Sequence, residues 1–268
     1  MPALSANRGK AEKDSDPLPV AQPNFALHGK SLFLDFDGTL VNIAPTPETI
    51  QVSPALPRRL AALQEAMDGA VAIVTGRDIA DIETFLPDFT GPIAGGHGSH
   101  MRTADGEYVT GNFDTARLQS IKRDISVFAH AINGVRVENK TAGCVLHYRQ
   151  APDAGEDAHR FVETLLREHP GFTAEAAKMA VEVRPEAIDK AGAVAEFSAL
   201  PPFRGRVPIF AGDDISDEPA FRWVNARGGC SIRIGEGPTS AQYCVSSVGD
   251  FALWIDSALA ALTTRTDR

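Results

Sequence analysis

Carboxylate side chains gather at two places in this sequence, each directly after a run of apolar residues. Asp35 and Asp37 end the first run, and the second run is followed by Asp213, Asp214 and Asp217. Residues two apart in a strand point to the same side, so we expect Asp35 and Asp37 to converge. Neighbouring carboxylates repel each other unless they share a proton or a cation, and clustered oxygen ligands suit a hard ion such as Mg²⁺. A simpler alternative is an exposed turn or a helix start, where acidic residues are common.

Three further residues could bind an anion beside these carboxylates. Thr75 and Arg77 end another apolar run, and Lys190 opens a predicted helix. The hydroxyl and backbone N–H of Thr75 would lie near the start of the next helix, where anions bind favourably, and Arg77 would add a planar cationic fork. Taken singly, Thr75 is equally typical of a helix cap, and a lone lysine such as Lys190 is most often a solvated surface residue.

The order of predicted strands and helices indicates how these side chains are positioned. Apolar runs at 31–36 and 71–74 each precede a helical pattern, and 92–94 indicates another strand. Alternation of this kind predicts parallel strands joined by right-handed crossovers. Ligand sites of such sheets lie beyond the carboxyl ends of the strands, where Asp35 and Asp37 fall.

The alternation is interrupted in the middle of the chain and then resumes. The interruption contains paired strands with helices set to one side, a pattern typical of an α+β unit. We therefore predict an α/β protein made of a disordered tail at 1–27, a core at 28–105 and 185–262, and an inserted α+β domain at 106–184.

Composition restricts the partners and the compartment. The 26 Lys and Arg against 35 Asp and Glu give a net charge of −9, which argues against a nucleic-acid partner. No apolar run approaches a membrane span, and the N-terminus lacks the apolar segment of a secretory signal. Cys144, Cys230 and Cys244 form no CxxC pair, which fits a reducing compartment. We expect a cytoplasmic protein without a membrane partner.

In their order along the chain, the residues above resemble the four motifs of haloacid-dehalogenase-type (HAD) phosphohydrolases. The motifs are Asp35–Thr39, the strand-end Thr75, Lys190 and Gly212–Asp217. The resemblance implies a Rossmann-like core with a mainly parallel sheet, in which Asp35 attacks phosphorus and Asp37 is the general acid and base. Thr75 and Lys190 would hold the phosphate. The implied Mg²⁺ site consists of Asp35, the backbone carbonyl of Asp37 and Asp213, with Asp214 and Asp217 nearby.

The segment between the second and third motifs is similar to trehalose-6-phosphate phosphatases. The similarity lies in Gly96–Gly98, Glu138–Lys140, His147–Arg149 and Lys178–Glu182. In that family a smaller domain, the cap, is inserted after the second motif, and charged side chains bind sugar hydroxyls through strong hydrogen bonds. The resemblance implies that Glu138, Lys140, Arg149, Lys178 and Glu182 contact the sugar, with Arg77 and His97 at the entrance or the phosphate.

Two positions depart from the family, and two alternative functions stay open. Ala191 follows Lys190 where the family usually has glycine, and His100 stands where it often has glutamate. The resemblance implies a sugar-phosphate substrate and functional coupling to a trehalose-6-phosphate synthase. The alternatives are a phosphatase for another sugar phosphate, of the sucrose or mannosyl type, and a non-catalytic sugar-phosphate sensor. The presence of both Asp35 and Asp37 argues against the sensor.

Overall fold

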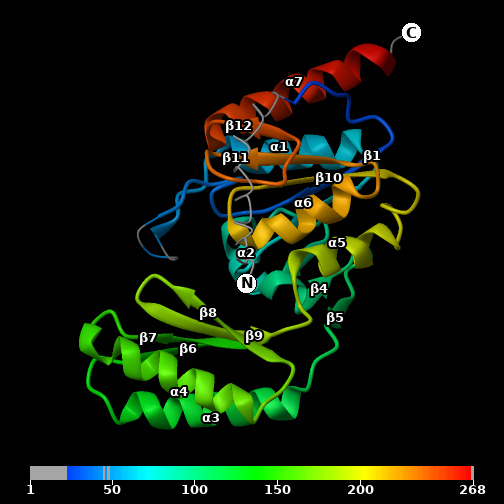
Figure 1. The fold of residues 1–268 in the computed structure, drawn as a ribbon. Helices are drawn as coiled ribbons and strands as arrows, with labels where there is room; N and C mark the ends of the chain where they lie inside the picture. Colours follow the sequence, from blue (N-terminus) through cyan, green and yellow to red (C-terminus); the bar gives the residue numbers. More distant parts are fainter. Residues whose placement is uncertain (1–22, 45, 47–48, 267–268) are drawn as a thin grey trace, which may run out of the picture.

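The computed structural model describes residues 23–44, 46 and 49–266 and contains two β-sheets, each with its own helices (Figure 1). The larger sheet has the strand order β12-β11-β10-β1-β2-β3-β4-β5. Its strands are β1 (Lys30–Leu34), β2 (Val71–Val74), β3 (Ile93–Gly95), β4 (His100–Arg102), β5 (Tyr108–Thr110), β10 (Val207–Gly212), β11 (Cys230–Ile234) and β12 (Tyr243–Val245).

The larger sheet is parallel from β12 to β3 and antiparallel at β4 and β5. Its central strands are apolar on both sides, and Leu32, Phe33 and Leu34 of β1 are completely buried. Continuous apolar runs are typical of parallel strands that helices cover on both faces. The mainly parallel α/β architecture predicted from the sequence is therefore confirmed.

Two layers of helices cover this sheet, and each buries its own apolar cluster. On one face α1, α2 and α7 pack through residues such as Leu60, Ile82 and Phe251. On the other face α5 and α6 pack through residues such as Phe197 and Phe221. The helices are α1 (Ala55–Ala66), α2 (Ile79–Phe85), α5 (Lys190–Ser198), α6 (Glu218–Asn225) and α7 (Val248–Thr266).

The smaller sheet is antiparallel, with the order β6-β7-β9-β8, and helices α3 and α4 pack on one face of it (Figure 1). Residues of β7 and β9 alternate, so that Leu146 and Val183 face the helices while Glu182 faces away from them. The open face is turned toward the larger sheet. The elements are α3 (Thr115–His130), β6 (Arg136–Lys140), β7 (Gly143–His147), α4 (Gly155–Arg167), β8 (Phe172–Ala177) and β9 (Ala180–Pro185).

The ends of the predicted segments differ from the structure at two places. Residues 1–22 of the predicted tail lie outside the described residues, but Pro23 and Leu27 are buried and Phe25 is half-buried. Leu27 is 1% exposed, and the ring of Phe25 lies 5.6 Å from that of Trp254. Strand β5 falls inside the range predicted for the insert, yet it pairs with β4 of the larger sheet. The packed core therefore starts earlier, and the larger sheet continues further, than the predicted boundaries.

Cys144, Cys230 and Cys244 are free thiols. Across the described ranges, none of the helices combines the length and the apolarity that a bilayer crossing requires.

Candidate active site

The candidate site lies where three neighbouring parallel strands end. Asp35 follows β1, Thr75 follows β2, and Asp213 follows β10. Strand β1 pairs with both β10 and β2, so the carboxyl ends of all three strands meet at one edge of the sheet. This edge is the usual ligand-binding edge of an open parallel sheet.

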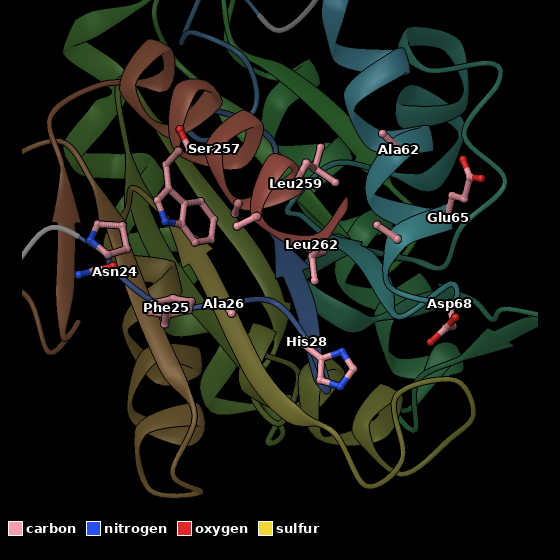
Figure 2. Close-up of a pocket in the computed structure, with 15 residues that line it drawn as sticks. Asn24, Phe25, Ala26, His28, Ala62, Glu65, Asp68, Ser257, Leu259 and Leu262 are labelled. Atoms are coloured by element: carbon pink, nitrogen blue, oxygen red, sulfur yellow. The ribbon is translucent and has the colours of Figure 1, made fainter. Parts of the chain in front are cut away.

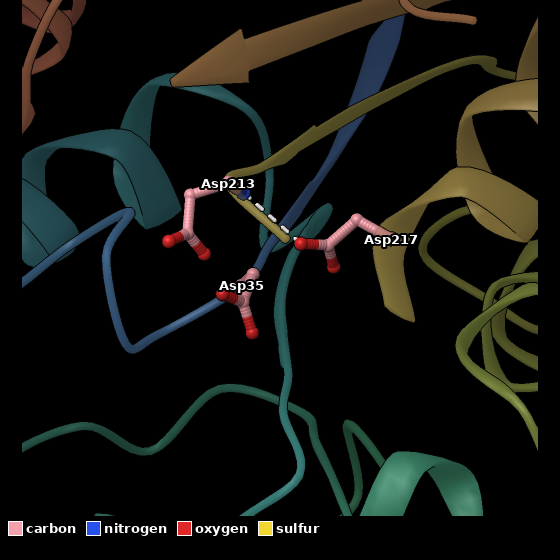
Figure 3. Close-up of side chains that lie close together, drawn as sticks. All are labelled: Asp35, Asp213 and Asp217. Carbon is pink, nitrogen blue, oxygen red and sulfur yellow. Dashed lines mark hydrogen bonds between the residues drawn. The ribbon is translucent and has the colours of Figure 1, made fainter. Parts of the chain in front are cut away.

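Three carboxylates crowd together at this edge, and Figure 3 shows the side chains of Asp35, Asp213 and Asp217 grouped beside one another. One oxygen of each lies within 4.8 Å of one oxygen of the others. Glycine makes this approach possible, because a Cβ at Gly38 would lie 1.9 Å from Asp213 Oδ2 and one at Gly212 would lie 2.3 Å from Asp217 Cγ. Any side chain at either glycine would separate the carboxylates.

Lys190 is the cation of this cluster. It is the first residue of α5, is 3% exposed, and donates to Asp35 Oδ1 at 2.7 Å and Asp217 Oδ1 at 2.6 Å. Burial raises the pKa of Asp35 well above its usual range, Lys190 opposes that rise, and the charges of Asp217 and Asp213 add to it. Burial alone would lower the pKa of Lys190, but the carboxylates of Asp217 and Asp35 outweigh it and raise that pKa.

The three aspartates of the second cluster have different environments. Both oxygens of Asp217 accept hydrogen bonds within the protein. Its Oδ1 accepts from Lys190, and its Oδ2 accepts the backbone N–H of Asp213 at 3.0 Å (Figure 3) and that of Asp214 at 2.9 Å. Asp214 is exposed and accepts the N–H of Ile215 at 2.7 Å, so it caps the short helix that follows. Burial, then the charge of Asp217, raises the pKa of Asp213 to about 6. The Asp213 side chain accepts no hydrogen bond within the described part of the chain.

Asp37 points to Arg77 and not to the crowded carboxylates. Arg77 donates through Nε to Asp37 Oδ2 at 2.6 Å and through Nη2 to Asp37 Oδ1 at 2.9 Å. The guanidinium also lies over the ring of Phe85, 5.2 Å from its centroid. Thr75 is buried, and its Oγ1 accepts the backbone N–H of Arg77 at 3.1 Å. The hydroxyl of Thr75 therefore orients the loop that carries Arg77.

The ring of His97 packs against the loop that follows β2, next to Gly76. Its φ of 60° is left-handed, and its ring lies so close to Gly76 that a Cβ there would be 2.8 Å from Nε2. Burial, followed by the nearby charge of Lys190, lowers the pKa of His97 to about 3. The imidazole is therefore neutral at physiological pH and acts as a polar wall of the site.

A cavity of about 660 Å³ joins these residues to the smaller domain. Glu138, Asn139 and Lys140 at the end of β6 line it together with the residues of the core. Lys140 Nζ pairs with Glu182 Oε1 at 2.7 Å, and His147 Nε2 pairs with Glu138 Oε2 at 2.9 Å. The predicted residues in its lining are Asp35, Asp37, Thr75, Arg77, His97, Glu138, Lys140, Lys190, Asp213 and Asp214.

Other predicted sugar contacts lie outside this lining. Arg149 follows β7 and Lys178 sits in the turn between β8 and β9, and both are exposed. Glu182 reaches the cavity only through its ion pair with Lys140. The structure thus brings together the core motifs and the end of β6, but not these three residues.

Several lining residues were not predicted as site residues from the sequence. They include Asp78, Asp81, Asn139 and Ser216. Asp78 follows Arg77 directly and Asn139 lies between Glu138 and Lys140, so their positions next to quoted residues were the available signal.

A larger cavity of about 1360 Å³ lies elsewhere and carries no comparable constellation (Figure 2). It is lined by α1, α7 and the segment around Phe25. His28 and Asp68 in its wall precede β1 and β2, so it lies at the amino ends of these strands, opposite the edge that carries Asp35.

Comparisons with known proteins agree with the geometry. Residues 33–248 match the protein family described as trehalose-phosphatase. A probable trehalose-phosphate phosphatase of Sinorhizobium fredii is 40% identical over 219 residues, which cover 81% of this chain and 82% of the relative. The trehalose-6-phosphate phosphatase of Escherichia coli K12 is 34% identical over 239 residues, covering 88% of each.

Solved structures show the same fold. A trehalose-6-phosphate phosphatase related protein superposes with a TM-score of 0.74 at 27% identity, covering 88% of this chain and all 100% of that one. A haloacid dehalogenase-like hydrolase of Bacteroides thetaiotaomicron has a TM-score of 0.64 at 17% identity, covering 85% and 98%, and supports the fold alone. This chain belongs to the trehalose-phosphatase family and is a phosphoric monoester hydrolase with a HAD-type fold.

Proposed function

We propose that this enzyme hydrolyses trehalose 6-phosphate to trehalose and phosphate through an aspartyl-phosphate at Asp35, with Mg²⁺ as cofactor. The observation that carries the proposal is the position of Asp35. It is buried beside Lys190 and Asp213, in a cavity that the charged residues of β6 also line. The names of the two similar relatives support the substrate.

In the first proposed step, an Asp35 oxygen attacks phosphorus in line with the sugar oxygen. The bond between phosphorus and that oxygen breaks, and Asp37 donates a proton to the leaving alkoxide. Lys190, 2.7 Å from Asp35 Oδ1, and the hydroxyl of Thr75 would stabilise the phosphoryl oxygens as charge develops there.

In the second proposed step, water attacks the phosphorus of the aspartyl-phosphate. Asp37, now ionised, takes the proton from that water, the bond between phosphorus and the Asp35 oxygen breaks, and inorganic phosphate leaves. Asp35 returns as a carboxylate and Asp37 as an acid, so both groups are ready for the next cycle.

The role of Asp37 requires its pair with Arg77 to open. Both guanidinium bonds to Asp37 are at hydrogen-bond distance, at 2.6 and 2.9 Å, and they hold the carboxylate away from Asp35. A phosphate dianion in the cavity would compete for Arg77, because a guanidinium fork binds phosphate as it binds a carboxylate. We propose that this exchange releases Asp37, which then takes up a proton from solvent and faces the leaving oxygen as the acid of the first step.

The donor set at the strand ends fits a hard divalent ion. Asp35 and Asp213 offer carboxylate oxygens, and their mutual repulsion is only partly offset by Lys190. We propose these two side chains and the Asp37 carbonyl as Mg²⁺ ligands, with Asp217 orienting Lys190 and Asp214 capping the following turn. When bound, Mg²⁺ would offset the negative charge of the carboxylates and the phosphate.

For the sugar, we propose Lys140 and Glu138 as direct contacts and Glu182 as the residue that orients Lys140. Arg77 and His97 would face the phosphate side of the cavity. Arg149 and Lys178 stay a prediction, because both lie outside the cavity in this structure. We also propose a cytoplasmic location and metabolic coupling to a trehalose-6-phosphate synthase.

A substrate panel tests this function. Purified protein with Mg²⁺ is expected to release phosphate from trehalose 6-phosphate at a kcat/KM at least about tenfold above that for glucose 6-phosphate or sucrose 6-phosphate, since several sugar hydrogen bonds separate them. Equal rates on all three would refute the assigned specificity and favour a related phosphatase of another sugar phosphate. Tight binding of the sugar phosphate without turnover would favour the sensor.

A further inference from the structure

A carboxylate of the core accepts hydrogen bonds from the smaller domain at the rim of the cavity. Asp78 Oδ2 accepts the backbone N–H of Thr141 at 3.2 Å and its hydroxyl at 3.0 Å. Asp78 directly follows Arg77 at the start of α2, and Thr141 directly follows Lys140 in the turn between β6 and β7. The bonds therefore join two residues whose neighbours line the cavity from opposite sides.

The local sequence frees Asp78 for this contact. Asp78 occupies the cap position of α2, with extended backbone angles, but its side chain makes no bond to its own helix. His100 caps the helix instead. Its Nε2 accepts the N–H of Ile79 at 3.1 Å, and its Nδ1 bonds to Ser99 Oγ at 3.0 Å. A side chain from β4 thus caps α2. Of the Asp78 carboxylate, Oδ1 lies 3.6 Å from His100 Nε2, and Oδ2 faces the turn.

The turn held by Asp78 also carries Lys140. The backbone carbonyl of Lys140 accepts a hydrogen bond from Lys122 of α3, and its ammonium group pairs with Glu182 of β9. These two contacts fix Lys140 within the smaller domain. The bond from Thr141 to Asp78 fixes the same strand end relative to the core.

We propose that Asp78 is a positioning residue, which through Thr141 holds the end of β6 over the cavity and so keeps Lys140 in place for the sugar phosphate. This inference rests on the proposed function for its substrate. If only the held arrangement binds the sugar, loss of the contact lowers the binding-competent fraction and raises the apparent dissociation constant in proportion.

A direct contact between Asp78 and the substrate is the competing explanation, because Asp78 itself lines the cavity. Thr141 is absent from that lining and separates the two. Thr141→Val removes the hydroxyl donor but leaves Asp78 untouched, whereas Thr141→Ser keeps the donor. Thr164→Val is a matched control, because Thr164 is exposed on α4 and its hydroxyl donates to the carbonyl of Arg160.

Steady-state kinetics provide the first test. We expect Thr141→Val to raise KM for trehalose 6-phosphate about tenfold with little change in kcat, since one hydrogen bond to a charged group is lost. Thr141→Ser and Thr164→Val should keep the wild-type KM. Hydrolysis of p-nitrophenyl phosphate, which has no sugar, should not change in Thr141→Val.

Amide hydrogen exchange provides a readout that does not depend on turnover. The N–H of Thr141 donates to Asp78, so Asp78→Ala should accelerate exchange at Thr141 by about tenfold while amides within β7 exchange as in the wild type. Unchanged exchange at Thr141 in Asp78→Ala, or an unchanged KM in Thr141→Val, would overturn the proposal. If the wild-type protein does not hydrolyse trehalose 6-phosphate but Asp78→Ala still accelerates exchange at Thr141, the proposed function is refuted. The positioning contact between Asp78 and Thr141 is then still supported.

Discussion

The two ends of the cavity hold the same kinds of charged groups in very different surroundings. At the core end the side chains of Lys190, Asp35 and Asp217 are 3%, 5% and 0% exposed. At the cap end those of Lys140 and Glu182 are 24% and 22% exposed. The core charges are therefore shielded from water, whereas the cap charges remain in contact with it.

This difference indicates a division of labour. Burying several charges costs stability unless every one is paired, and the core holds an excess of carboxylate over cation. Such a cluster suits chemistry, because electrostatic interactions with a reacting group are strong where water is excluded. Ion pairs that are about a quarter exposed, such as Lys140 with Glu182, contribute little stability and can exchange partners, which suits reversible sugar binding. We expect core substitutions to change the chemical step and cap substitutions to change substrate choice.

The largest effect is expected for Asp35→Asn. Loss of the nucleophile should lower kcat by about 10³-fold or more, since the residues around it act as a unit. The fold should survive. Burial raises the pKa of the Asp35 carboxyl, which means that its charge is unfavourable in the folded state, and the amide of asparagine carries no charge. Phosphate release and thermal denaturation measure both effects, and persistent release by this variant would show that the nucleophile is misassigned.

Removal of the metal should come next. Chelation is expected to abolish turnover, and Mg²⁺ should restore it. Because the ion would bind the folded state alone, Mg²⁺ at about 100 times its dissociation constant should also stabilise the protein by about 2.7 kcal/mol. A melting temperature that is the same with and without Mg²⁺, together with full activity in chelator, would contradict a metal site at Asp35 and Asp213.

Lys190→Ala should damage both activity and stability. It leaves Asp217 buried and without its cation, and breaking a buried ion pair costs about 3–5 kcal/mol. We expect kcat to fall about 10²-fold, because a charge that stabilises the phosphoryl oxygens is lost. Urea denaturation and single-turnover rates separate the two losses. A variant that is destabilised but turns over at the normal rate would restrict Lys190 to a structural role.

The smallest effect is expected at the cap. Glu182→Ala releases Lys140 from its pair, which is about a quarter exposed, so stability should hardly change. The kcat/KM for trehalose 6-phosphate should fall about tenfold, while that for p-nitrophenyl phosphate should stay constant. An equal fall for both substrates would remove the distinction between the two ends of the cavity.

Much of the core end could be predicted from the sequence, because its residues directly follow apolar runs that indicate strands. Apolar runs that end in polar residues predict parallel strands whose carboxyl ends carry the site. The approach of Asp35 to Asp213 was implied by the family resemblance and not by the pattern, and the pairing of β1 with β10 brings it about. The resemblance to trehalose-6-phosphate phosphatases is confirmed by the family match, and the HAD-type fold that the resemblance implied is confirmed by the solved structures.

What the sequence did not predict depends on contacts between distant residues. No spacing rule indicates that His100 caps α2, that Asp78 contacts Thr141, or that both oxygens of Asp217 are used by the protein. The same holds for β5. Its residues Tyr108, Val109 and Thr110 favour a strand, but all three are exposed, so no alternation of buried and exposed residues assigns the strand to the larger sheet. Such features become visible only when the packed chain is known.

Trapping of the covalent intermediate tests the central claim most directly. Enzyme turning over trehalose 6-phosphate with Mg²⁺ is quenched in acid, reduced with borohydride and mapped by peptide mass spectrometry, with substrate-free enzyme as the control. Because borohydride reduces an acyl phosphate to an alcohol, we predict homoserine in place of Asp35 in the turning-over sample alone. Reduction at a different carboxylate, with Asp35 intact, would contradict the account.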